Sequence, residues 1–122
     1  MTKVLLVEDD WDVADVTAYL LRRHGFDVVT AADGVEALSC WRADTPDLVL
    51  LDVALPGLSG FDVARAIRSE SPGTRVVFLS AHADEAHVVQ GRALGAAYVT
   101  KPYNSQQLLA GLQAVLDAAP AR

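Results

Sequence analysis

The chain has 122 residues, a net charge of −6 and a sequence pI of about 4.8. This length predicts a single domain with its own hydrophobic core. The apolar runs are far shorter than the roughly 20 residues of a membrane-spanning helix, and the N-terminus lacks the apolar stretch of a secretory signal. The acidic balance and the scattered basic residues argue against direct nucleic-acid binding, and the only cysteine, Cys40, leaves no internal disulfide. We therefore expect a cytoplasmic protein.

Short apolar segments rich in β-forming residues alternate five times with amphipathic segments of helical periodicity. In chain order, the pattern predicts a strand over 4–7, a helix over 11–24, a strand over 26–30, a helix over 33–43, a strand over 47–51, a helix over 61–69, a strand over 75–79, a weaker helix over 84–94, a strand over 96–99 and a last helix that starts near residue 105. Gly25 stands where a glycine commonly ends a helix. Asn104 or Ser105 can cap the last helix.

Apolar residues mark one side of several predicted helices. They are Val13, Val16 and Leu20 in the first, Val35, Leu38 and Trp41 in the second, and Leu108, Leu112, Val115 and Leu116 in the last. Gly91 interrupts the fourth helix, and two interpretations stay open. At a cost of roughly 1 kcal/mol relative to alanine, it suits a helix that rearranges; equally, it could serve close packing.

Five strands alternating with five helices predict a doubly wound α/β fold, in which helices cover both faces of a parallel sheet. The segment 47–51 is apolar without alternation, as in a central strand that is buried on both faces. Such sheets bind ligands beyond the carboxyl ends of the strands, where the strand order reverses. If the order is 2-1-3-4-5, the ends of the first, third and fourth strands lie together.

Polar side chains follow four of the five predicted strands: Glu8, Asp9 and Asp10 follow the first, Asp52 the third, Ser80 the fourth and Lys101 the fifth. Each alone has an ordinary explanation, because acidic turns commonly begin helices and an aspartate before a Pro-Gly loop commonly forms a turn. Together they predict clustered carboxylates whose repulsion a divalent cation relieves, with Mg²⁺ preferred and Mn²⁺ able to substitute. A lysine and a hydroxyl beside such a cluster describe a phosphoryl-transfer site whose nucleophile is a carboxylate.

Four motifs at these positions resemble the receiver domains of two-component response regulators. They are LLVEDD at 5–10, DLVLLDVALPGLSGFDVARAIR at 47–68, VVFLSA at 76–81 and GAAYVTKPY at 95–103. The resemblance implies a flavodoxin-like sheet of order 2-1-3-4-5, a receiver domain over 1–118 and a tail or linker over 119–122. It also implies Mg²⁺-dependent transfer of a phosphoryl group from a sensor histidine kinase or phosphotransfer protein, followed by slow self-catalysed dephosphorylation. The phosphorylated domain would control an output domain or a separate partner and would form a homodimer.

The resemblance further implies a role for each site residue. Asp52 would accept the phosphoryl group, and Lys101 would bind it. The metal ion would be held by Asp9, Asp52, the backbone carbonyl of Ala54 and, through water, Glu8. Ser80 and Tyr98 would change position on phosphorylation and so repack the face formed by the fourth helix, the fifth strand and the last helix. The peptide bond before Pro102 would be cis. Asp10 is expected to cap the first helix.

Two features depart from the winged-helix transcription regulators of the same family. Ala96 and Ala97 stand where those proteins usually carry acidic residues, and the last helix has no basic residue between 108 and 116. We therefore do not expect their charged dimer interface. Ala54 is also smaller than the methionine that is frequent at this position, which would open the site to solvent.

Two other functions fit this topology less well. A flavodoxin-like electron carrier needs a loop rich in Ser, Thr and Gly after the first strand to bind the flavin phosphate, whereas residues 8–12 are acidic and repel an anion. An aspartate-nucleophile phosphatase carries a second aspartate two residues after the nucleophile, where this chain has Ala54. Turnover as a phosphatase would therefore be poor.

Overall fold

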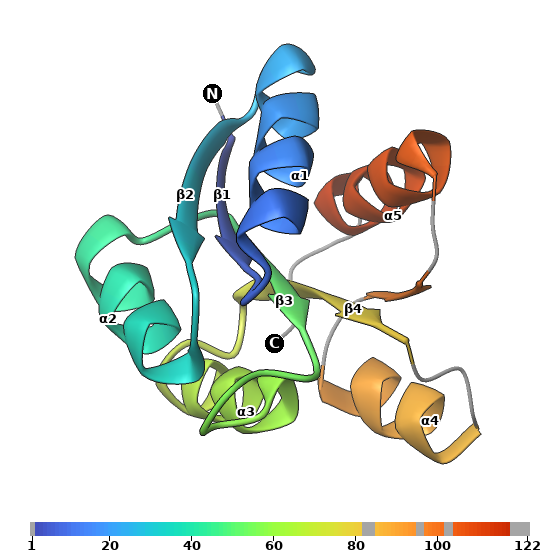
Figure 1. The fold of residues 1–122 in the computed structure, drawn as a ribbon. Coiled ribbons are helices and arrows are strands. Elements are labelled where there is room, and N and C mark those ends of the chain that lie inside the picture. Colours follow the sequence, from blue (N-terminus) through green and yellow to red (C-terminus); the bar gives the residue numbers. More distant parts are fainter. Residues whose placement is uncertain (1, 82–84, 95–96, 102–103, 118–122) are drawn as a thin grey trace.

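The structure of the protein, a computed structural model, describes residues 2–81, 85–94, 97–101 and 104–117. Within these ranges five strands alternate with five helices (Figure 1): β1 Lys3–Val7, α1 Trp11–Arg23, β2 Asp27–Ala31, α2 Gly34–Asp44, β3 Leu48–Asp52, α3 Gly60–Glu70, β4 Arg75–Ser80, α4 Glu85–Leu94, β5 Ala97–Thr100 and α5 Ser105–Asp117. The predicted elements are all present, and their ends are shifted by about one residue. In the same ranges, no helix combines the length and the hydrophobicity that a membrane span requires.

The strands form one parallel sheet in the order β2-β1-β3-β4-β5, which confirms the predicted topology. Residues 4–7 of β1 pair with residues 48–51 of β3, and residues 48–52 of β3 pair with residues 75–79 of β4. Every residue of β3 is buried, because this strand has a neighbour on each side and helices over both faces. The carboxyl ends of β1, β3 and β4 therefore meet at one edge of the sheet.

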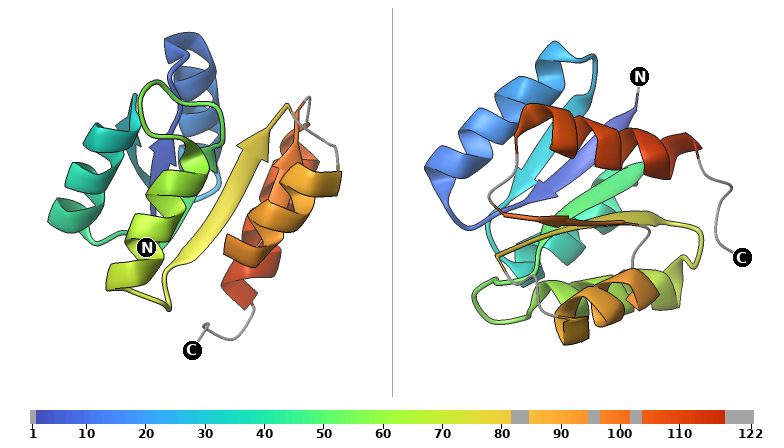
Figure 2. Two further views of the ribbon diagram at one scale, coloured as in Figure 1. Left: turned by 90° about the horizontal axis from the view of Figure 1, so that it is seen from below. Right: turned by 90° about the vertical axis from the view of Figure 1, so that its right-hand side faces the viewer.

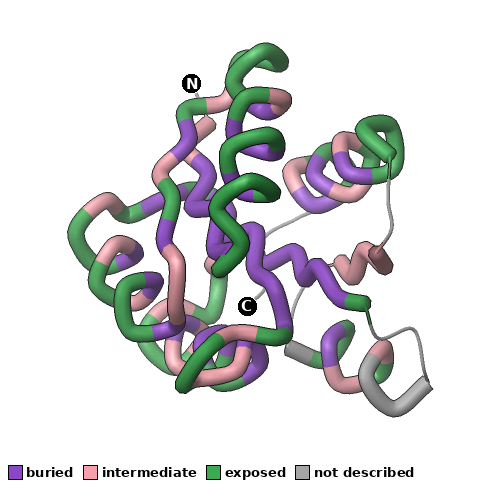
Figure 3. The backbone as a smooth tube through the Cα atoms, in the orientation of Figure 1, coloured by how far each residue is buried: buried purple, intermediate pink, exposed green. Residues whose placement is uncertain are grey.

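Helices cover both faces of this sheet. Figures 1 and 2 show α1 and α5 on one face and α2, α3 and α4 on the other. On the first face, Leu50 of β3 belongs to a buried cluster with Leu21 of α1 and Leu108 of α5. On the second, Phe78 of β4 belongs to a cluster with Ile67 of α3. The buried residues in Figure 3 accordingly follow the strands and the inward sides of the helices.

The inward side of α1 is not the predicted one. Small or medium side chains face the sheet, namely those of Ala14, Thr17, Ala18 and Leu21. Val13 and Val16 are 37% and 70% exposed, whereas Leu20 packs partly against the core, so the apolar residues at helical spacing do not make up the buried face. The true face is turned by one residue, or about 100°, because small side chains let the helix lie close to the sheet. Similarly, Val35, which the sequence pattern placed on the apolar side of α2, is 71% exposed.

Local signals set the helix ends. The carboxylate of Asp10 accepts hydrogen bonds from the backbone N–H groups of Asp12 at 3.0 Å and Val13 at 3.2 Å, so the predicted cap of α1 is confirmed. Gly25 follows α1 with a φ of 89°, a left-handed conformation that favours glycine. Asn104 caps α5 and exchanges two hydrogen bonds with Gln107. Local sequence therefore fixes where α1 and α5 begin and where α1 ends.

The start of α3 lies directly against the end of β3. Ser59 and Asp62 form a capping box at this helix, and the backbone N–H of Gly60 donates to the carbonyl of Val53 at 2.8 Å. A Cβ atom at residue 60 would lie 2.8 Å from Val53 Cα and would also collide with the carbonyl oxygen of Asp52. Gly60 therefore permits the close approach that fixes the backbone at Asp52.

We predict that Gly60→Ala lowers the free energy of unfolding by about 1–3 kcal/mol, because the added methyl group meets backbone atoms that have little freedom to move. Chemical denaturation of the purified domain measures this change. Ser69→Ala on the exposed side of the same helix is the control and should stay within about 0.5 kcal/mol of the wild type. Equal stabilities for Gly60→Ala and the wild type would contradict the prediction.

Candidate functional site

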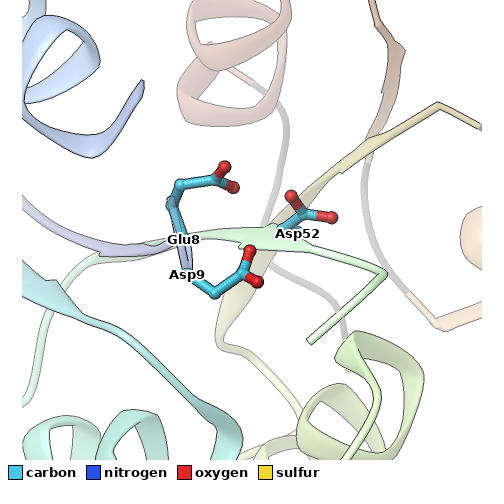
Figure 4. A group of neighbouring side chains, drawn as sticks. All are labelled: Glu8, Asp9 and Asp52. Atoms are coloured by element: carbon cyan, nitrogen blue, oxygen red, sulfur yellow. The ribbon is translucent and has the colours of Figure 1, made fainter. Parts of the chain in front are cut away.

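Two adjacent strands bring three carboxylates together. Glu8 and Asp9 follow β1, and Asp52 ends the neighbouring strand β3. One oxygen atom of each carboxylate lies within 4.8 Å of the others, and Figure 4 shows the three side chains arranged around one space. Glu8 and Asp52 are only 5% and 4% exposed, whereas Asp9 is exposed. The acidic residues that the sequence analysis expected to converge therefore do so.

Asp52 is held from two sides. The backbone N–H of Ala54 donates to Asp52 Oδ1 at 2.9 Å, and Lys101 Nζ donates to Asp52 Oδ2 at 2.5 Å. This second contact is a charge-assisted hydrogen bond, which is stronger than a neutral one. Lys101 comes from the end of β5, two strands away in the sheet. The carboxylate thus has a fixed orientation before any ligand binds.

Glu8 is less well compensated. Lys101 Nζ lies 3.6 Å from Glu8 Oε2, and in the part of the chain that the structure describes no hydrogen bond reaches this buried oxygen. The pKa of Glu8 is raised to about 8, first of all by burial. A side-chain hydrogen bond with Asp52 and the negative charge of Asp52 raise it further, whereas the positive charge of Lys101 lowers it. Without a further cation, Glu8 therefore holds a proton at neutral pH.

The donor atoms suit a hard divalent cation. Glu8, Asp9 and Asp52 offer oxygen atoms only, and Mg²⁺ and Mn²⁺ prefer such ligands whereas zinc is usually bound by nitrogen or sulfur. A buried carboxylate oxygen without a hydrogen-bond partner is a group that a metal ion can satisfy. One lysine also cannot balance the three carboxylates when all of them are ionised. The residues present therefore fit a magnesium site.

Ser80 lies at the same edge of the sheet as Asp52 but outside the carboxylate cluster. It is the last residue of β4, it is 1% exposed and it pairs with Thr100 of β5. The carbonyl of Ser80 accepts a hydrogen bond from the backbone N–H of Lys101 at 2.7 Å. The backbone of Ser80 is thus joined to the residue whose side chain contacts Asp52. Pro102 and the bond before it lie outside the described residues.

The sequence analysis missed an aromatic row next to Tyr98. Tyr98 pairs with Phe78 across β5 and β4, with 6.3 Å between the ring centroids. Phe61 of α3 packs edge-to-face on Phe78 at 5.2 Å. The pairing of Tyr98 with Phe78 follows from the strand order and could have been found. The contact with Phe61 could not, because it depends on where α3 lies over the sheet.

The fold and the site together define a class of protein, namely a doubly wound signalling-type domain of order 2-1-3-4-5 with an acidic cluster and a lysine at the carboxyl edge of its sheet, where such folds bind their ligands. The model of the response regulator receiver domain family matches residues 4–113, and the chain belongs to this family. Membership favours this function over an electron carrier or a phosphatase.

Curated relatives contain the same domain within longer proteins. The sensory transduction protein RegX3 of Mycolicibacterium smegmatis is 44% identical over 117 residues, which cover 95% of this chain and 51% of that protein. The transcriptional regulatory protein CseB of Streptomyces coelicolor is 48% identical over 116 residues, which cover 94% of this chain and 49% of that protein. The chain thus spans about half the length of these relatives.

Solved structures agree with this assignment. The chemotaxis protein CheY4 of Vibrio cholerae has a TM-score of 0.89 and 32% identity, covering 94% of this chain and 98% of that one. The response regulator TrrA of Thermotoga maritima, in complex with Mg²⁺ and BeF, has a TM-score of 0.87 and 28% identity, covering 94% and 99%. The chain is therefore a receiver domain of a two-component response regulator.

We predict that the metal-free domain loses stability as the pH rises from about 5 to 8. Glu8 has a raised pKa of about 8 in the folded state against 4.5 in the unfolded chain, so its proton stabilises the fold fully below pH 4.5 and this contribution is lost as the pH approaches 8. Thermal unfolding in a chelator measures the effect. A loss of about 1 kcal/mol would lower Tm by roughly 4 °C.

The control is Glu8→Gln, which has no proton to lose. It should show a flatter dependence of Tm on pH than the wild type, and Mg²⁺ should stabilise it less. Identical pH profiles for the two proteins in chelator would contradict the assignment of the titration to Glu8.

Proposed function

We propose that this domain accepts a phosphoryl group on Asp52 from a phosphohistidine of a sensor histidine kinase or a phosphotransfer protein. The observation that carries the proposal is the buried carboxylate of Asp52, paired with Lys101 Nζ at 2.5 Å and lying beside Glu8 and Asp9. The complex of the similar protein TrrA with Mg²⁺ and BeF also supports a site for a metal ion and a phosphate-like group.

In the transfer, a carboxylate oxygen of Asp52 attacks the phosphorus atom of the phosphohistidine. A P–O bond forms, the P–N bond breaks, and its electron pair stays on the ring nitrogen. The other ring nitrogen carries a proton, so the histidine leaves as neutral imidazole. The N–H of Ala54 keeps the Asp52 carboxylate oriented, and Lys101 Nζ binds an oxygen of the incoming phosphoryl group. Hydrolysis of the acyl phosphate is slow, because Ala54 offers no acid–base side chain.

The acidic cluster would hold Mg²⁺, with Mn²⁺ able to substitute. Glu8 through water, Asp9, Asp52 and the backbone carbonyl of Ala54 are its ligands in this proposal. When bound, the ion neutralises negative charge between the carboxylates and the phosphoryl oxygens. The buried Oε2 of Glu8, which accepts no hydrogen bond from the described residues, supports this assignment.

Phosphorylation would be read at the face made by α4, β5 and α5. The new phosphoryl oxygens attract the hydroxyl of Ser80, and the ring of Tyr98 occupies the space that Ser80 leaves, so one of two packings becomes favoured. The domain, over residues 1–118 with a tail or linker at 119–122, would pass this change to an output domain or a separate partner. The greater length and the names of RegX3 and CseB support an output domain.

A homodimer that forms on phosphorylation would use apolar or neutral contacts. The sequence of α5, Ser105–Asp117, contains no lysine or arginine, and Ala97 is the first residue of β5. α5 therefore lacks the basic residues of a charged interface.

We predict that Asp52→Asn abolishes the uptake of acid-labile phosphate from acetyl phosphate in the presence of Mg²⁺, because the amide is not a nucleophile at phosphorus. Mass spectrometry of the intact protein at neutral pH measures the added phosphoryl mass. The isosteric change leaves the fold in place, which circular dichroism checks. Undiminished uptake in Asp52→Asn would place the phosphoryl group on another residue.

We predict that Lys101→Gln slows phosphoryl uptake by about 100-fold, in line with the loss of one preorganised donor from a site that stabilises developing charge. Lys3→Gln is the matched control, because Lys3 is the other lysine of the chain and contacts the carbonyl of Asp44 at 3.4 Å, away from the cluster. Uptake rates under the same conditions should be unchanged in this control. Equal rates for Lys101→Gln and the wild type would remove Lys101 from the mechanism.

A further inference from the structure

A notch in α4 holds the ring of Tyr98. Gly91 is buried in the second half of this helix. A Cβ atom placed on Gly91 would lie 2.6 Å from Tyr98 Cε2 and closer still to Tyr98 Cδ2, whereas the next atom, Phe78 Cδ2, would be 3.5 Å away. The space that a side chain would need at residue 91 is therefore filled by the tyrosine ring and by little else.

The backbone of Gly91 does not itself require a glycine. Positive φ angles among the described glycines occur only at Gly25 and Gly57, and in a helix alanine is favoured over glycine. The contact with Tyr98 thus accounts for Gly91. Of the two interpretations left open by the sequence, close packing is the one that the structure supports.

We propose that Gly91 is a positioning residue of the switch, whose open notch keeps the Tyr98 ring inward and couples the position of that ring to α4. The inference rests on the proposed function and extends it: of the two packings, the one that a phosphoryl group on Asp52 favours is the inward one, in which the Tyr98 ring fills this notch. It adds the reason why the inward ring affects α4: in this position the ring lies between residue 91 and Phe78, so that the helix and the sheet are packed through it.

A coupling of this kind has to act in both directions. If a phosphate-like group at Asp52 favours the inward ring, a methyl group that expels the ring must weaken the binding of that group by the same factor. Gly91 makes no contact with the carboxylate cluster, so a change in affinity caused by Gly91→Ala would reach Asp52 only through Tyr98 and the strands.

The packing contact is tested by the sign of a stability change. Gly91→Ala should lower Tm in the wild-type background, because the methyl group collides with the ring. In a Tyr98→Leu background the same substitution should raise Tm, because the helix then gains from alanine without the collision. A rise in Tm in both backgrounds, or an equal fall in both, would overturn the proposed notch.

The coupling is tested with Mg²⁺ and beryllofluoride as a mimic of the phosphoryl group. Gly91→Ala should weaken the binding of beryllofluoride by about fivefold or more, the lower range of typical couplings between sites. NMR signals of the Tyr98 ring should already be displaced before beryllofluoride is added and should then change less than in the wild type. Unchanged affinity together with a wild-type ring response would overturn the coupling.

Gly111→Ala is the matched control. Its Cβ would press on Val99 Cγ2 of the same strand at 3.0 Å but would not meet Tyr98, so the affinity for beryllofluoride should stay near that of the wild type. An equal loss of affinity in this variant would mean that any strain on β5 suffices, and would overturn the specific role of Gly91.

Failure of the proposed function and failure of the coupling give different results. If the wild type itself does not bind beryllofluoride, and takes up no phosphoryl group at Asp52, the proposed function fails. Normal binding in both the wild type and Gly91→Ala refutes the coupling alone.

Discussion

The ion pair between Lys101 and Asp52 is the interaction on which the site depends. A single ammonium group lies 2.5 Å from one carboxylate and 3.6 Å from a second, while a third carboxylate lies nearby. It compensates Asp52 and leaves Glu8 buried with an unsatisfied oxygen. Burying charge is costly unless it is paired, so the domain keeps an electrostatic conflict that a bound cation and a phosphoryl group can resolve. The conflict makes the site responsive to both.

The sheet makes this concentration of charge tolerable. β3 is buried throughout and apolar until its last residue, so the carboxylate of Asp52 lies where the dry core ends at the carboxyl edge of the sheet. The parallel register carries the ends of β1 and β4 to the same level. Close packing at Gly60 then holds the backbone beyond Asp52 against α3. The backbone position of Asp52 is thus set by strand pairing and packing, independently of the charges around its carboxylate.

The sequence predicted the elements and the members of the acidic cluster, because strand periodicity, helix-ending glycines and polar residues at strand ends are all local signals. The strand order, in contrast, was implied by the resemblance to receiver domains. The sequence did not predict which side of α1 is buried. Val16 is more hydrophobic than Ala14, yet Ala14 faces the sheet because the distance between helix and sheet favours small side chains. The contact of Gly91 with Tyr98 was equally out of reach, since it depends on how far α4 lies from β5, a distance that no local pattern encodes.

The place of β5 in the sheet explains how a change at Asp52 could reach the surface. It is an edge strand of four residues, all of them only partly buried, with β4 as its one neighbour. Lys101 follows its end, and Tyr98 lies three residues earlier on the same strand. Edge elements with few buried contacts open and shift at lower cost than central ones. A movement that begins at Lys101 therefore meets the least resistance along β5, and the ring of Tyr98 in the notch at Gly91 is the first contact through which such a movement would act on α4.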